Sequence, residues 1–557
     1  MTRWDYETDL LVVGSGGGGM TAALVGKLEG METLIIEKTE YFGGSTALSG
    51  GFVWVPDNYV MAEAGLPDSH EQAALYLETI IGERVPRVKQ EAYLHASREM
   101  MAYLRNHTQV KFQLTPGYTD YYPELPGGTF GGRGVEPTPV NGKELGEEFK
   151  HLRPSIFEAP MGLALTSKEY RQVGMVTSTL EGLVAGIKIG VRAAYCAVAG
   201  VKLLTLGQAL AARLRLSLLD AGVPLWLSAP MEDLILENDC LVGARVTKQG
   251  QTVNIKANSG VVLAAGGFPL NREMREKYQP HPITTQWTSA SPGNTGDAIQ
   301  MGQALGGALD LMEDAWWGPA SLPPGSVPFF RVGERAYPGG IIVNSQGKRF
   351  MNESLPYVDA VKEMYRHNHD ESRTIPAHFI MDQRFRNKYL FGTLFPMLNI
   401  PQEYLDCGYF VKAETLEELA EKIGISVQGL LESVGQFNQF AASGIDQDFQ
   451  RGESAYDRYY GDPSVKPNPC LAPINKPPFY SVKIYPGDIG TKGGLVTDEK
   501  ARVLKEDGSI IPGLYAVGNT SAAVMGNSYP GPGGTIGPAM TFGYIAAKDL
   551  LSSNGIL

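Results

Sequence analysis

The sequence predicts a mixed α/β fold in which a parallel-sheet domain is split in the sequence around an inserted α+β domain. Over residues 9–38, an apolar strand, a glycine-rich turn, a helix and a second strand follow one another, which is the order of a βαβ unit. Near the other end of the chain, residues 510–522 predict a strand entering a glycine turn, and residues 535–551 predict an amphipathic helix. Together these segments are expected to form one Rossmann-like domain.

The first segment has the features that a dinucleotide site requires. Its strand LLVV is apolar at every position, as expected of a parallel strand buried on both faces. Gly14, Gly16 and Gly19 fit the pattern GxGxxG, which gives a tight turn, a close approach to a pyrophosphate and a helix N-terminus directed at negative charge. Glu37 ends the second strand, where it can accept a hydrogen bond from a ribose hydroxyl, so NAD or FAD is expected.

Two further loops are expected to contact the same ligand. YFGGSTALSGGFVW (41–54) contains four glycines and three hydroxyl residues, so it can lie along a diphosphate and reach a planar ring. GVVLAAGGF (260–268) is a short glycine motif at the end of another apolar strand. The sequence has no second GxGxxG, so electrons are not expected to arrive from a nicotinamide.

The predicted domains are 1–314 for the first part of the nucleotide-binding domain, 315–487 for the inserted catalytic domain and 488–557 for the second part. The proline-rich stretch 462–479 is typical of an extended linker that returns the chain from the insertion. Pro538 falls in the first turn of the final helix, where proline is tolerated.

Composition argues against several classes of protein. The net charge of −12 disfavours nucleic-acid binding. The four cysteines show no CxxC spacing, and no metal-binding or hydrolase motif occurs, so neither a disulfide frame nor a metal is expected. The N-terminus has acidic residues where a secretory signal needs basic ones, and no stretch of 18 or more residues is free of charge and apolar enough to span a bilayer. A cytoplasmic location is therefore predicted.

Residues 180–210 are strongly apolar and contain three basic residues, Lys188, Arg192 and Lys202. At about 100° per residue, the three would share one narrow helical face. Two interpretations stay open: a helix or hairpin packed into the fold, or an interfacial helix within 150–210 that lies on an anionic membrane. The second would place the protein on the inner face of the cytoplasmic membrane.

Tyrosine is abundant, with 26 residues, whereas none of the eight histidines follows His378. Three tyrosine-containing loops are rich in proline or glycine or lie beside them, at 116–128, 349–360 and 528–534. In the last of these, SYPGPGG, Tyr529 stands on a constrained loop directly before the final helix. These phenols are candidates for acid–base chemistry.

YPGPGGTIGPAM (529–540), GTKGGLVTD (490–498), NESLPY (352–357) and the N-terminal glycine motif together resemble the 3-ketosteroid Δ1-dehydrogenases. These enzymes lie within the flavoprotein superfamily of fumarate reductase and succinate dehydrogenase. The resemblance covers nearly the whole chain and is closest to the longer members of the family. It implies non-covalent FAD, a steroid substrate, and removal of two hydrogens from C1 and C2 of the steroid A ring beside the C3 ketone.

The resemblance also implies the roles of four residues. Tyr529 and the N–H of Gly533 would donate hydrogen bonds to the C3 carbonyl and form an oxyanion hole for the developing enolate. Tyr357 would take the C2 proton as the base, and a hydride would then leave C1 for N5 of the flavin. Tyr121 would assist Tyr357, with Tyr122 as the alternative one residue away.

By the same resemblance, the glycine-rich loops would hold FAD, and the N-terminus of the final helix would face the pyrimidine carbonyl of the flavin. The residues expected to bind the cofactor are Gly14, Ser15, Gly16, Gly19, Met20, Glu37, Lys38, Gly43, Gly44, Ser45, Thr46, Ser49, Gly50, Gly51, Ala265, Gly266, Gly518, Asn519, Gly534, Thr535 and Ile536.

The sequence leaves three alternative functions open. A Δ4-dehydrogenase of 5α-reduced 3-ketosteroids is the nearest, although YPGPG favours Δ1 chemistry. A soluble fumarate reductase would need convergent arginines and a histidine in the inserted and C-terminal regions. A non-catalytic flavin carrier would have no need of the inserted domain. The preferred steroid stays open, with cholest-4-en-3-one suited to membrane contact, and a quinone or other electron acceptor is expected to reoxidise the flavin.

Overall fold

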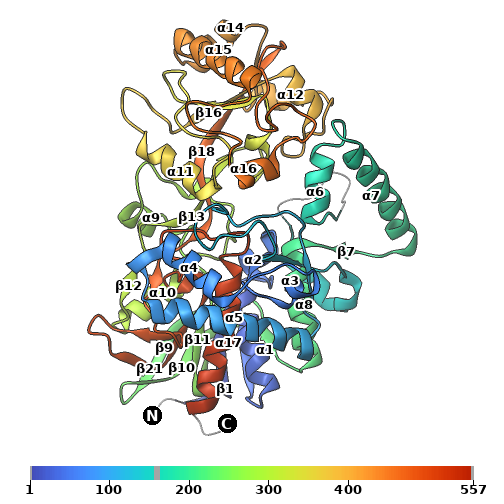
Figure 1. Ribbon diagram of the computed structural model, residues 1–557. Coiled ribbons are helices and arrows are strands. Elements are labelled where there is room, and N and C mark those ends of the chain that lie inside the picture. Colours follow the sequence, from blue (N-terminus) through green and yellow to red (C-terminus); the bar gives the residue numbers. More distant parts are fainter. Residues whose placement is uncertain (1–2, 156–163, 554–557) are drawn as a thin grey trace.

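The computed structural model describes residues 3–155 and 164–553 and contains two main sheets (Figure 1). The first sheet lies in the lower half of Figure 1, and β1 and β2 pair in parallel at its centre. Its strands, in spatial order, are β20 (Arg502–Leu504), β21 (Ile510–Ala516), β11 (Gln251–Leu263), β1 (Tyr6–Val13), β2 (Thr33–Ile36) and β8 (Leu225–Trp226), with β10 (Cys240–Lys248) and β9 (Met231–Glu237) extending from β11.

The sheet joins both ends of the chain, as the sequence predicts. Strand β11 pairs in parallel with β1 on one side and with β21 on the other. Helix α1 (Gly17–Leu28) packs against α17 (Ile536–Ser553), and the contact is close because a Cβ at Gly18 would meet the Ala539 backbone. The apolar run of β1 is almost completely buried, which explains why every residue of that run is apolar.

The inserted domain is built on a second sheet, in the upper half of Figure 1. Its strands are β14 (Phe329–Phe330), β13 (Ala315–Ser321), β18 (Phe479–Thr491), β16 (Ala377–Asp382) and β15 (Gly340–Val343), with β17 (Val411–Ala413) pairing with β18. The predicted boundary at 315 coincides with the start of β13, whereas the boundary at 487 falls inside β18. The stretch 462–478 contains neither helix nor strand, in agreement with the predicted linker.

Further helices cover both sheets. They are α2 (Gly44–Leu48), α3 (Tyr59–Glu63), α4 (His70–Ile81), α5 (Arg87–His107), α8 (Leu206–Asp220), α9 (Arg272–Tyr278), α10 (Asp297–Ala304), α11 (Tyr357–Arg366), α12 (Gln383–Lys388), α13 (Gln402–Asp406), α14 (Leu416–Ile423), α15 (Val427–Ser443) and α16 (Ala455–Tyr460). The short strands are β3 (Val53–Trp54), β4 (Phe112–Leu114), β5 (Gly134–Pro137), β6 (Val140–Asn141), β7 (Leu203–Leu204), β12 (Leu309–Asp310) and β19 (Gly494–Leu495).

Helices α6 (Ser167–Gly174) and α7 (Leu180–Ala199) stand at the right edge of the molecule in Figure 1. Among the described residues, α7 is the one helix that is long and apolar enough to cross a membrane by length and composition. Because α7 contains Lys188 and Arg192, it is not the charge-free stretch that the sequence analysis excluded. Residues 156–163 of the predicted membrane segment lie outside the described residues.

The charges of α7 are not arranged as the sequence predicted. Gly200 takes a left-handed conformation and ends the helix, so Lys202 lies beyond it, with its ammonium over the Phe149 ring. Arg192 faces α6, where it pairs with Glu169 at 2.6 Å. Only Lys188 is an exposed cation on the helix. The predicted cationic face is thus replaced by an apolar one.

Candidate active site

One continuous cavity of about 1130 Å³ connects the glycine-rich turn after β1 with the tyrosine loops and with α7. The two main sheets both contribute to its wall, through Val13 of β1 and Phe330 of β14. The cavity therefore has room for a dinucleotide and a second, apolar molecule beside it.

The glycines of the first turn are present for different structural reasons. Gly14 has φ +108°, which a side chain rarely adopts, and a Cβ on Gly19 would collide with the Gly14 carbonyl. By contrast, a Cβ on Gly16 would make only an ordinary contact, with Thr46 Oγ1 at 3.8 Å as its nearest neighbour. The protein's own packing therefore does not demand glycine at this position, which leaves room for a ligand to approach the backbone. Because α1 begins at Gly17, the positive end of its dipole is directed at that space, as a pyrophosphate requires, while the Gly17 N–H itself donates to Thr46 Oγ1 at 2.9 Å.

Glu37 is held in place by hydrogen bonds beside this space at Gly16 and the start of α1, which we call the cradle. Its Oε2 accepts hydrogen bonds from the backbone N–H and hydroxyl of Ser15, the latter at 2.7 Å, and its Oε1 accepts from the N–H and hydroxyl of Thr39. A carboxylate offers about four acceptor positions, and these four bonds occupy them. Because Glu37 also lines the cavity, a ribose hydroxyl of a dinucleotide can reach it by taking the place of the Ser15 or Thr39 hydroxyl.

Most of the predicted cofactor residues line the cavity. They are Gly14, Ser15, Gly16, Glu37, Lys38, Gly44, Ser45, Thr46, Ser49, Gly50, Gly51, Ala265, Gly266, Gly518, Asn519, Thr535 and Ile536. Helix α17 begins at Ile536, so the positive end of its dipole is directed at the same space. Together, the open position at Gly16, two helix N-termini and the Glu37 acceptor fit FAD.

Four predicted cofactor residues lie outside the cavity wall, and each has a role in packing. Gly19 packs on the Gly14 turn, and Met20 is fully buried in the core. Gly43 faces Ala47 and Ala211, whereas Gly534 packs against Pro530 and Tyr529. Contact between these four residues and the cofactor stays a prediction, and their packing gives a second reason for the residue types found there.

We expect Gly16→Val to weaken FAD binding by about tenfold or more while the apoprotein still folds, because the new side chain enters the cradle. FAD titration by flavin fluorescence measures the affinity, and circular dichroism checks the fold. Gly19→Ala is the matched control: it should lower the yield of folded protein, because its Cβ meets backbone. Unchanged FAD affinity in Gly16→Val would contradict the assignment of the cradle.

The three predicted catalytic tyrosines come together from different parts of the chain. The Tyr121 hydroxyl donates to the Tyr357 hydroxyl at 2.7 Å. The ring of Tyr529 lies 5.1 Å from that of Tyr121 and 5.5 Å from that of Tyr357, between ring centroids. Each side chain is almost completely buried, yet each lines the cavity. The structure thus forms one cluster of phenols at the wall.

The helix and the loops explain these positions. Tyr357 is the first residue of α11, directly after Pro356, which suits the start of a helix. The Tyr121 backbone N–H and the Tyr76 hydroxyl both donate to the Pro530 carbonyl, at 3.0 and 2.7 Å. The loop that carries Tyr121 is therefore tied directly to the loop that carries Tyr529.

Burial keeps these phenols protonated at neutral pH. Desolvation raises the pKa of Tyr121 and that of Tyr357 well above 10, and it also raises the pKa of Tyr529. The hydrogen bond from Tyr121 acts in the opposite direction and lowers the pKa of Tyr357. Of the neighbouring hydroxyls, Tyr121 is thus the one that helps Tyr357 to act as a base.

Gly533 supplies a backbone donor close to Tyr529. It has φ +94°, and a Cβ there would collide with the backbone N–H groups of Val53 and Trp54. Its carbonyl accepts from Trp54 and Gly537, but no hydrogen bond to another described residue occupies its own N–H. Because Gly533 lines the cavity, this N–H and the Tyr529 hydroxyl can serve one ligand oxygen.

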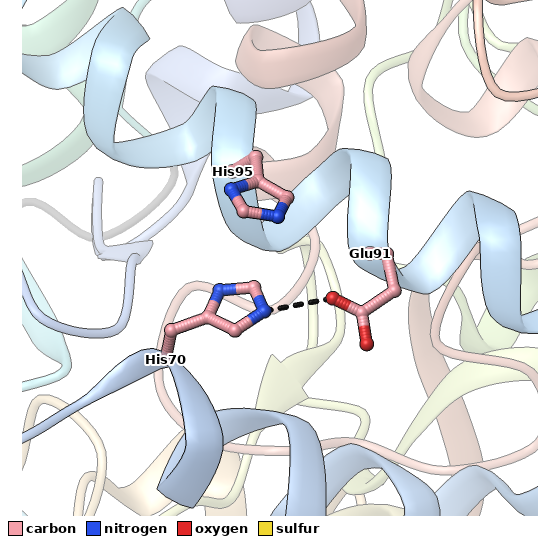
Figure 2. Close-up of side chains that lie close together, drawn as sticks. All are labelled: His70, Glu91 and His95. Atoms are coloured by element: carbon pink, nitrogen blue, oxygen red, sulfur yellow. Dashed lines mark hydrogen bonds and ion pairs between the residues drawn. The ribbon is translucent and has the colours of Figure 1, made fainter.

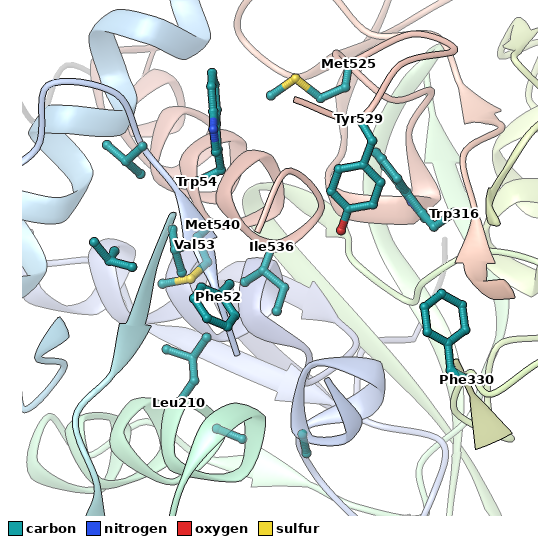
Figure 3. Close-up of a cluster of buried hydrophobic side chains, with 14 of the residues drawn as sticks. Phe52, Val53, Trp54, Leu210, Trp316, Phe330, Met525, Tyr529, Ile536 and Met540 are labelled. Atoms are coloured by element: carbon teal, nitrogen blue, oxygen red, sulfur yellow. The ribbon is translucent and has the colours of Figure 1, made fainter. Parts of the chain in front are cut away.

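Figure 3 shows Tyr529 beside Trp316, with its hydroxyl pointing into the space between Ile536 and Phe330. The hydroxyl lies 3.0 Å from Thr535 Oγ1, and the Trp316 ring meets the phenol edge-on at 4.9 Å. The rest of the cluster in Figure 3 is apolar. Tyr529 is therefore held by rings on one side and free to donate toward the cavity on the other.

The two adjacent tyrosines have different partners. Tyr121 reaches Tyr357, whereas the Tyr122 hydroxyl donates to Asp359 at 2.8 Å. Asp359 lies on α11, half a turn beyond Tyr357. The geometry therefore favours Tyr121 as the partner of the base, and the Tyr122–Asp359 bond fixes α11 against the same loop.

Among the described residues, one group of three side chains could hold a metal ion: His70, Glu91 and His95 (Figure 2). His70 Nε2 lies 2.8 Å from Glu91 Oε2, and the two imidazoles stack with centroids 4.4 Å apart and an interplanar angle of 27°. Ligand lone pairs lie in the ring plane, so stacked rings do not direct them at one point. The group does not line the cavity.

Sequence reasoning missed part of the cavity wall. Phe330 packs on Tyr357 with ring centroids 5.2 Å apart, and Leu390 and Phe395 line the end near α7. Single apolar residues such as these give no signal in a sequence, because the same residues occur throughout any core. Their role is visible only from the fold.

A family model described as FAD binding domain matches residues 9–536. The chain therefore belongs to the FAD-binding flavoproteins. It is 48% identical over 558 residues to the 3-oxosteroid 1-dehydrogenase of Mycobacterium tuberculosis, with 99% of each chain covered. Within the flavoproteins, it belongs to the 3-oxosteroid 1-dehydrogenases.

A crystal structure of 3-ketosteroid Δ1-dehydrogenase from Sterolibacterium denitrificans, in complex with 1,4-androstadiene-3,17-dione, is also similar. It shows 41% identity and a TM-score of 0.94, covering 98% of this chain and 100% of the other. A relative from Sinomonas cyclohexanicum, the 4-oxocyclohex-2-ene-1-carboxylate 5-dehydrogenase, is 36% identical over 97% of this chain and 93% of its own length. The resemblance predicted from the motifs is confirmed.

Proposed function

We propose that the protein removes hydrogens from C1 and C2 of a 3-ketosteroid and so converts a Δ4-3-ketosteroid to the 1,4-diene-3-ketone. The observation that carries this proposal is the placement of the Tyr529 hydroxyl and the Gly533 N–H beside the bonded pair Tyr121 and Tyr357 on one cavity wall. Two donors and a base in one apolar space are what dehydrogenation next to a ketone requires.

The roles follow from the positions of these groups. Tyr529 and Gly533 donate to the C3 oxygen and stabilise the negative charge that develops there, which acidifies the C2 hydrogen. Tyr357 takes the C2 proton in its ionised form and becomes a neutral phenol, and Tyr121, which donates a hydrogen bond to the Tyr357 oxygen, stabilises the negative charge that Tyr357 carries before the transfer. FAD, when bound in the cradle, supplies the acceptor for the hydride from C1. The buried aromatic wall excludes water from these charges, which strengthens each interaction.

The cavity wall favours a large apolar ring system. Phe330, Phe395 and Leu390 line the space beyond the tyrosines, whereas no histidine among the described residues does. A fumarate reductase would need a cationic dicarboxylate site there. The two arginines that line this cavity already have partners in the protein: Arg192 pairs with Glu169, and Arg171 donates to the Tyr459 carbonyl. Because the space continues to α7, a steroid with a long C17 side chain, such as cholest-4-en-3-one, is the proposed preference.

Turnover with an artificial electron acceptor tests the reaction. Three substrates are compared: a Δ4-3-ketosteroid, a 5α-saturated 3-ketosteroid and 4-oxocyclohex-2-ene-1-carboxylate. The proposal predicts the 1,4-diene as the product of the first and the highest kcat/KM for that substrate. A preference for introducing a Δ4 bond into the saturated steroid, or for the cyclic carboxylate, would contradict it.

We further propose that α7 contacts a lipid bilayer through its exposed apolar face, which would place a cytoplasmic protein on the inner face of the cytoplasmic membrane. That face consists of Leu180, Leu183, Val184, Ile187, Val191, Tyr195 and Val198, each between 42% and 92% exposed. Exposed apolar patches of this extent mark interaction sites. The opposite side of α7 lines the cavity through Ile189 and Ala193, so an apolar substrate could pass between bilayer and site.

A second exposed apolar segment, next to Phe395, adds to the support for membrane contact. Phe395 packs against the small core cluster of α7, and two residues later Met397 and Leu398 are 71% and 60% exposed. The net charge of −12 disfavours binding to anionic lipid by charge alone. Contact is therefore expected through apolar side chains, with weak dependence on salt.

Ile187→Glu/Val191→Glu should lower the vesicle-bound fraction by about tenfold or more, because burial of each such side chain is worth roughly 1.5–3 kcal/mol. Flotation with neutral phosphatidylcholine vesicles and with vesicles containing phosphatidylglycerol measures binding. Leu75→Glu/Val88→Glu, at exposed apolar positions of α4 and α5, is the control and should bind as the wild type does. Equal flotation of both variants, or a wild type that dimerises without binding vesicles, would contradict the proposal.

A quinone is the proposed electron acceptor. The chain has no second dinucleotide motif, and an acceptor dissolved in the bilayer would reach the site by the route proposed for the steroid. Reoxidation of the reduced enzyme by a soluble quinone, compared with NAD, tests this proposal. Reoxidation by NAD alone would contradict it.

A further inference from the structure

Lys492 is a fully buried cation beneath the loop that carries Tyr529, and none of the roles above uses it. It follows directly after β18, in the motif GTKGG. Its side chain is 0% exposed, and its ammonium lies 3.1 Å from Asp314 Oδ2. A buried charge of this kind costs free energy unless it is paired and hydrogen-bonded, so we expect the Lys492 charge to have a role.

The contacts of Lys492 converge on Tyr529. Its ammonium donates to the Ser528 carbonyl at 3.0 Å, and Ser528 directly precedes Tyr529. The same ammonium lies 4.9 Å from the centroid of the Trp316 ring, and this ring packs edge-on against Tyr529. Lys492 thus holds both the backbone before Tyr529 and the ring beside it.

The neighbouring residues extend this support. Asp314 Oδ2 also accepts from the Asn527 amide at 3.1 Å, and the Lys362 ammonium donates to the Asn527 carbonyl at 2.5 Å. Three charged groups lie around Lys492 and this loop: Asp314, Lys362 and Asp359. Three more lie on the outer side of Asn527: Arg84, Asp310 and Glu313.

We propose that Lys492 is a positioning residue for Tyr529, and that its positive charge keeps the phenol in the orientation that donates to the substrate ketone. Charge-assisted hydrogen bonds are roughly twice as strong as neutral ones, and the attraction to the Trp316 face requires the charge. Loss of the proton would therefore weaken both contacts and leave Asp314 as a buried charge without its partner. The inference rests on the proposed steroid dehydrogenation.

The charge of Lys492 is lost within an accessible range of pH. Burial lowers the pKa of Lys492 to about 8, with Asp314 opposing the shift. The unfolded chain keeps this proton up to the ordinary lysine pKa of 10.5, so it binds more protons than the folded protein between the two pKa values. Over that range this lysine makes folding more favourable as pH rises, while the rate of steroid oxidation is expected to fall. General alkaline unfolding would lower stability and rate together.

The test is the rate of flavin bleaching by a Δ4-3-ketosteroid, measured without oxygen from about pH 7 to pH 10. Wild type should slow above about pH 8, and Lys492→Arg should not slow there, because a guanidinium stays charged. Lys89→Arg is the matched control. Lys89 is also buried with a pKa of about 8, but it contacts Thr497 and no residue of the tyrosine cluster, so this variant should keep the wild-type profile.

Lys492→Met/Asp314→Asn removes both charges and leaves no unpaired ion, which keeps the inference testable if the arginine does not fit. It should retain bound FAD and bleach about 10- to 100-fold more slowly at pH 7, as expected for a displaced donor. If the steroid bleaches the wild-type flavin but Lys492→Arg still slows above about pH 8, the inference on Lys492 is wrong. It is also wrong if the double variant bleaches as fast as wild type. In both cases the proposed function is unaffected. If wild type does not bleach with the steroid at all, the proposed function itself fails.

Discussion

Tyr357→Phe should retain FAD and lose about 10²–10⁴-fold in the rate of flavin reduction, the usual contribution of a positioned general base. The ring stays in place against Phe330, and only the hydroxyl that faces Tyr121 is removed. The loss of that hydrogen bond costs the fold only about 1 kcal/mol. The expected effect is therefore on the chemical step, with a smaller change in the affinity for steroid.

Rapid mixing with a Δ4-3-ketosteroid, without oxygen, separates the two quantities. The dependence of the bleaching rate on steroid concentration gives the affinity, and its limit gives the chemical rate. Tyr365→Phe is the matched control, since Tyr365 lies on the same helix and its hydroxyl donates to Pro282 outside the cavity. A Tyr357→Phe enzyme as fast as the control would show that another group takes the C2 proton.

Tyr529→Phe should lower the same rate by about 10²–10³-fold, or roughly 3–4 kcal/mol, because it removes one of two donors to the developing enolate. Gly533 remains as the second donor, so some activity should survive. The ring contacts of Tyr529 with Trp316 and Tyr121 are unaffected, and the fold and FAD content should match wild type.

A control for Tyr529→Phe is available in the same part of the chain. Tyr515 is buried, and its hydroxyl donates to Asp549 at 2.9 Å away from the cavity. Tyr515→Phe should reduce flavin at the wild-type rate. If Tyr529→Phe also did so, the oxyanion hole would have to be built from other donors.

The nucleotide-binding half could be predicted because its signals are local. The run LLVV, the glycines and Glu37 form one continuous βαβ unit, and each residue has a reason within that unit. The limit of such spacing is shown by Met20, which follows the glycines yet is fully buried in the core. Spacing identifies the loop that meets a ligand, but only the backbone direction decides which of its side chains do.

The catalytic cluster could be predicted only through resemblance. Tyr121, Tyr357 and Tyr529 come from three distant segments, and no periodicity relates them. The choice between Tyr121 and Tyr122 depended on the fold, which directs the first toward Tyr357 and the second toward Asp359. Lys492 lies in the motif GTKGGLVTD, but its contacts could not be predicted, because its partners Asp314 and Ser528 are far away in the sequence.

The segment around α7 shows how a helical pattern can mislead. Its three cations were placed on one face by assuming a helix that continues through Lys202. Gly200 ends the helix before that residue, and Arg192 turns inward to Glu169. The exposed side of α7 is therefore its apolar face, and the proposal of membrane contact is based on that face.

The most direct test of the whole account is a single turnover of the wild-type enzyme without oxygen. The protein, with its FAD, is mixed with one equivalent of a Δ4-3-ketosteroid, and the visible flavin absorption and the steroid product are followed together. The account predicts that the flavin bleaches and that one 1,4-diene-3-ketone forms for each flavin reduced. An unreduced flavin in an enzyme that retains FAD, or bleaching without that diene, would contradict it.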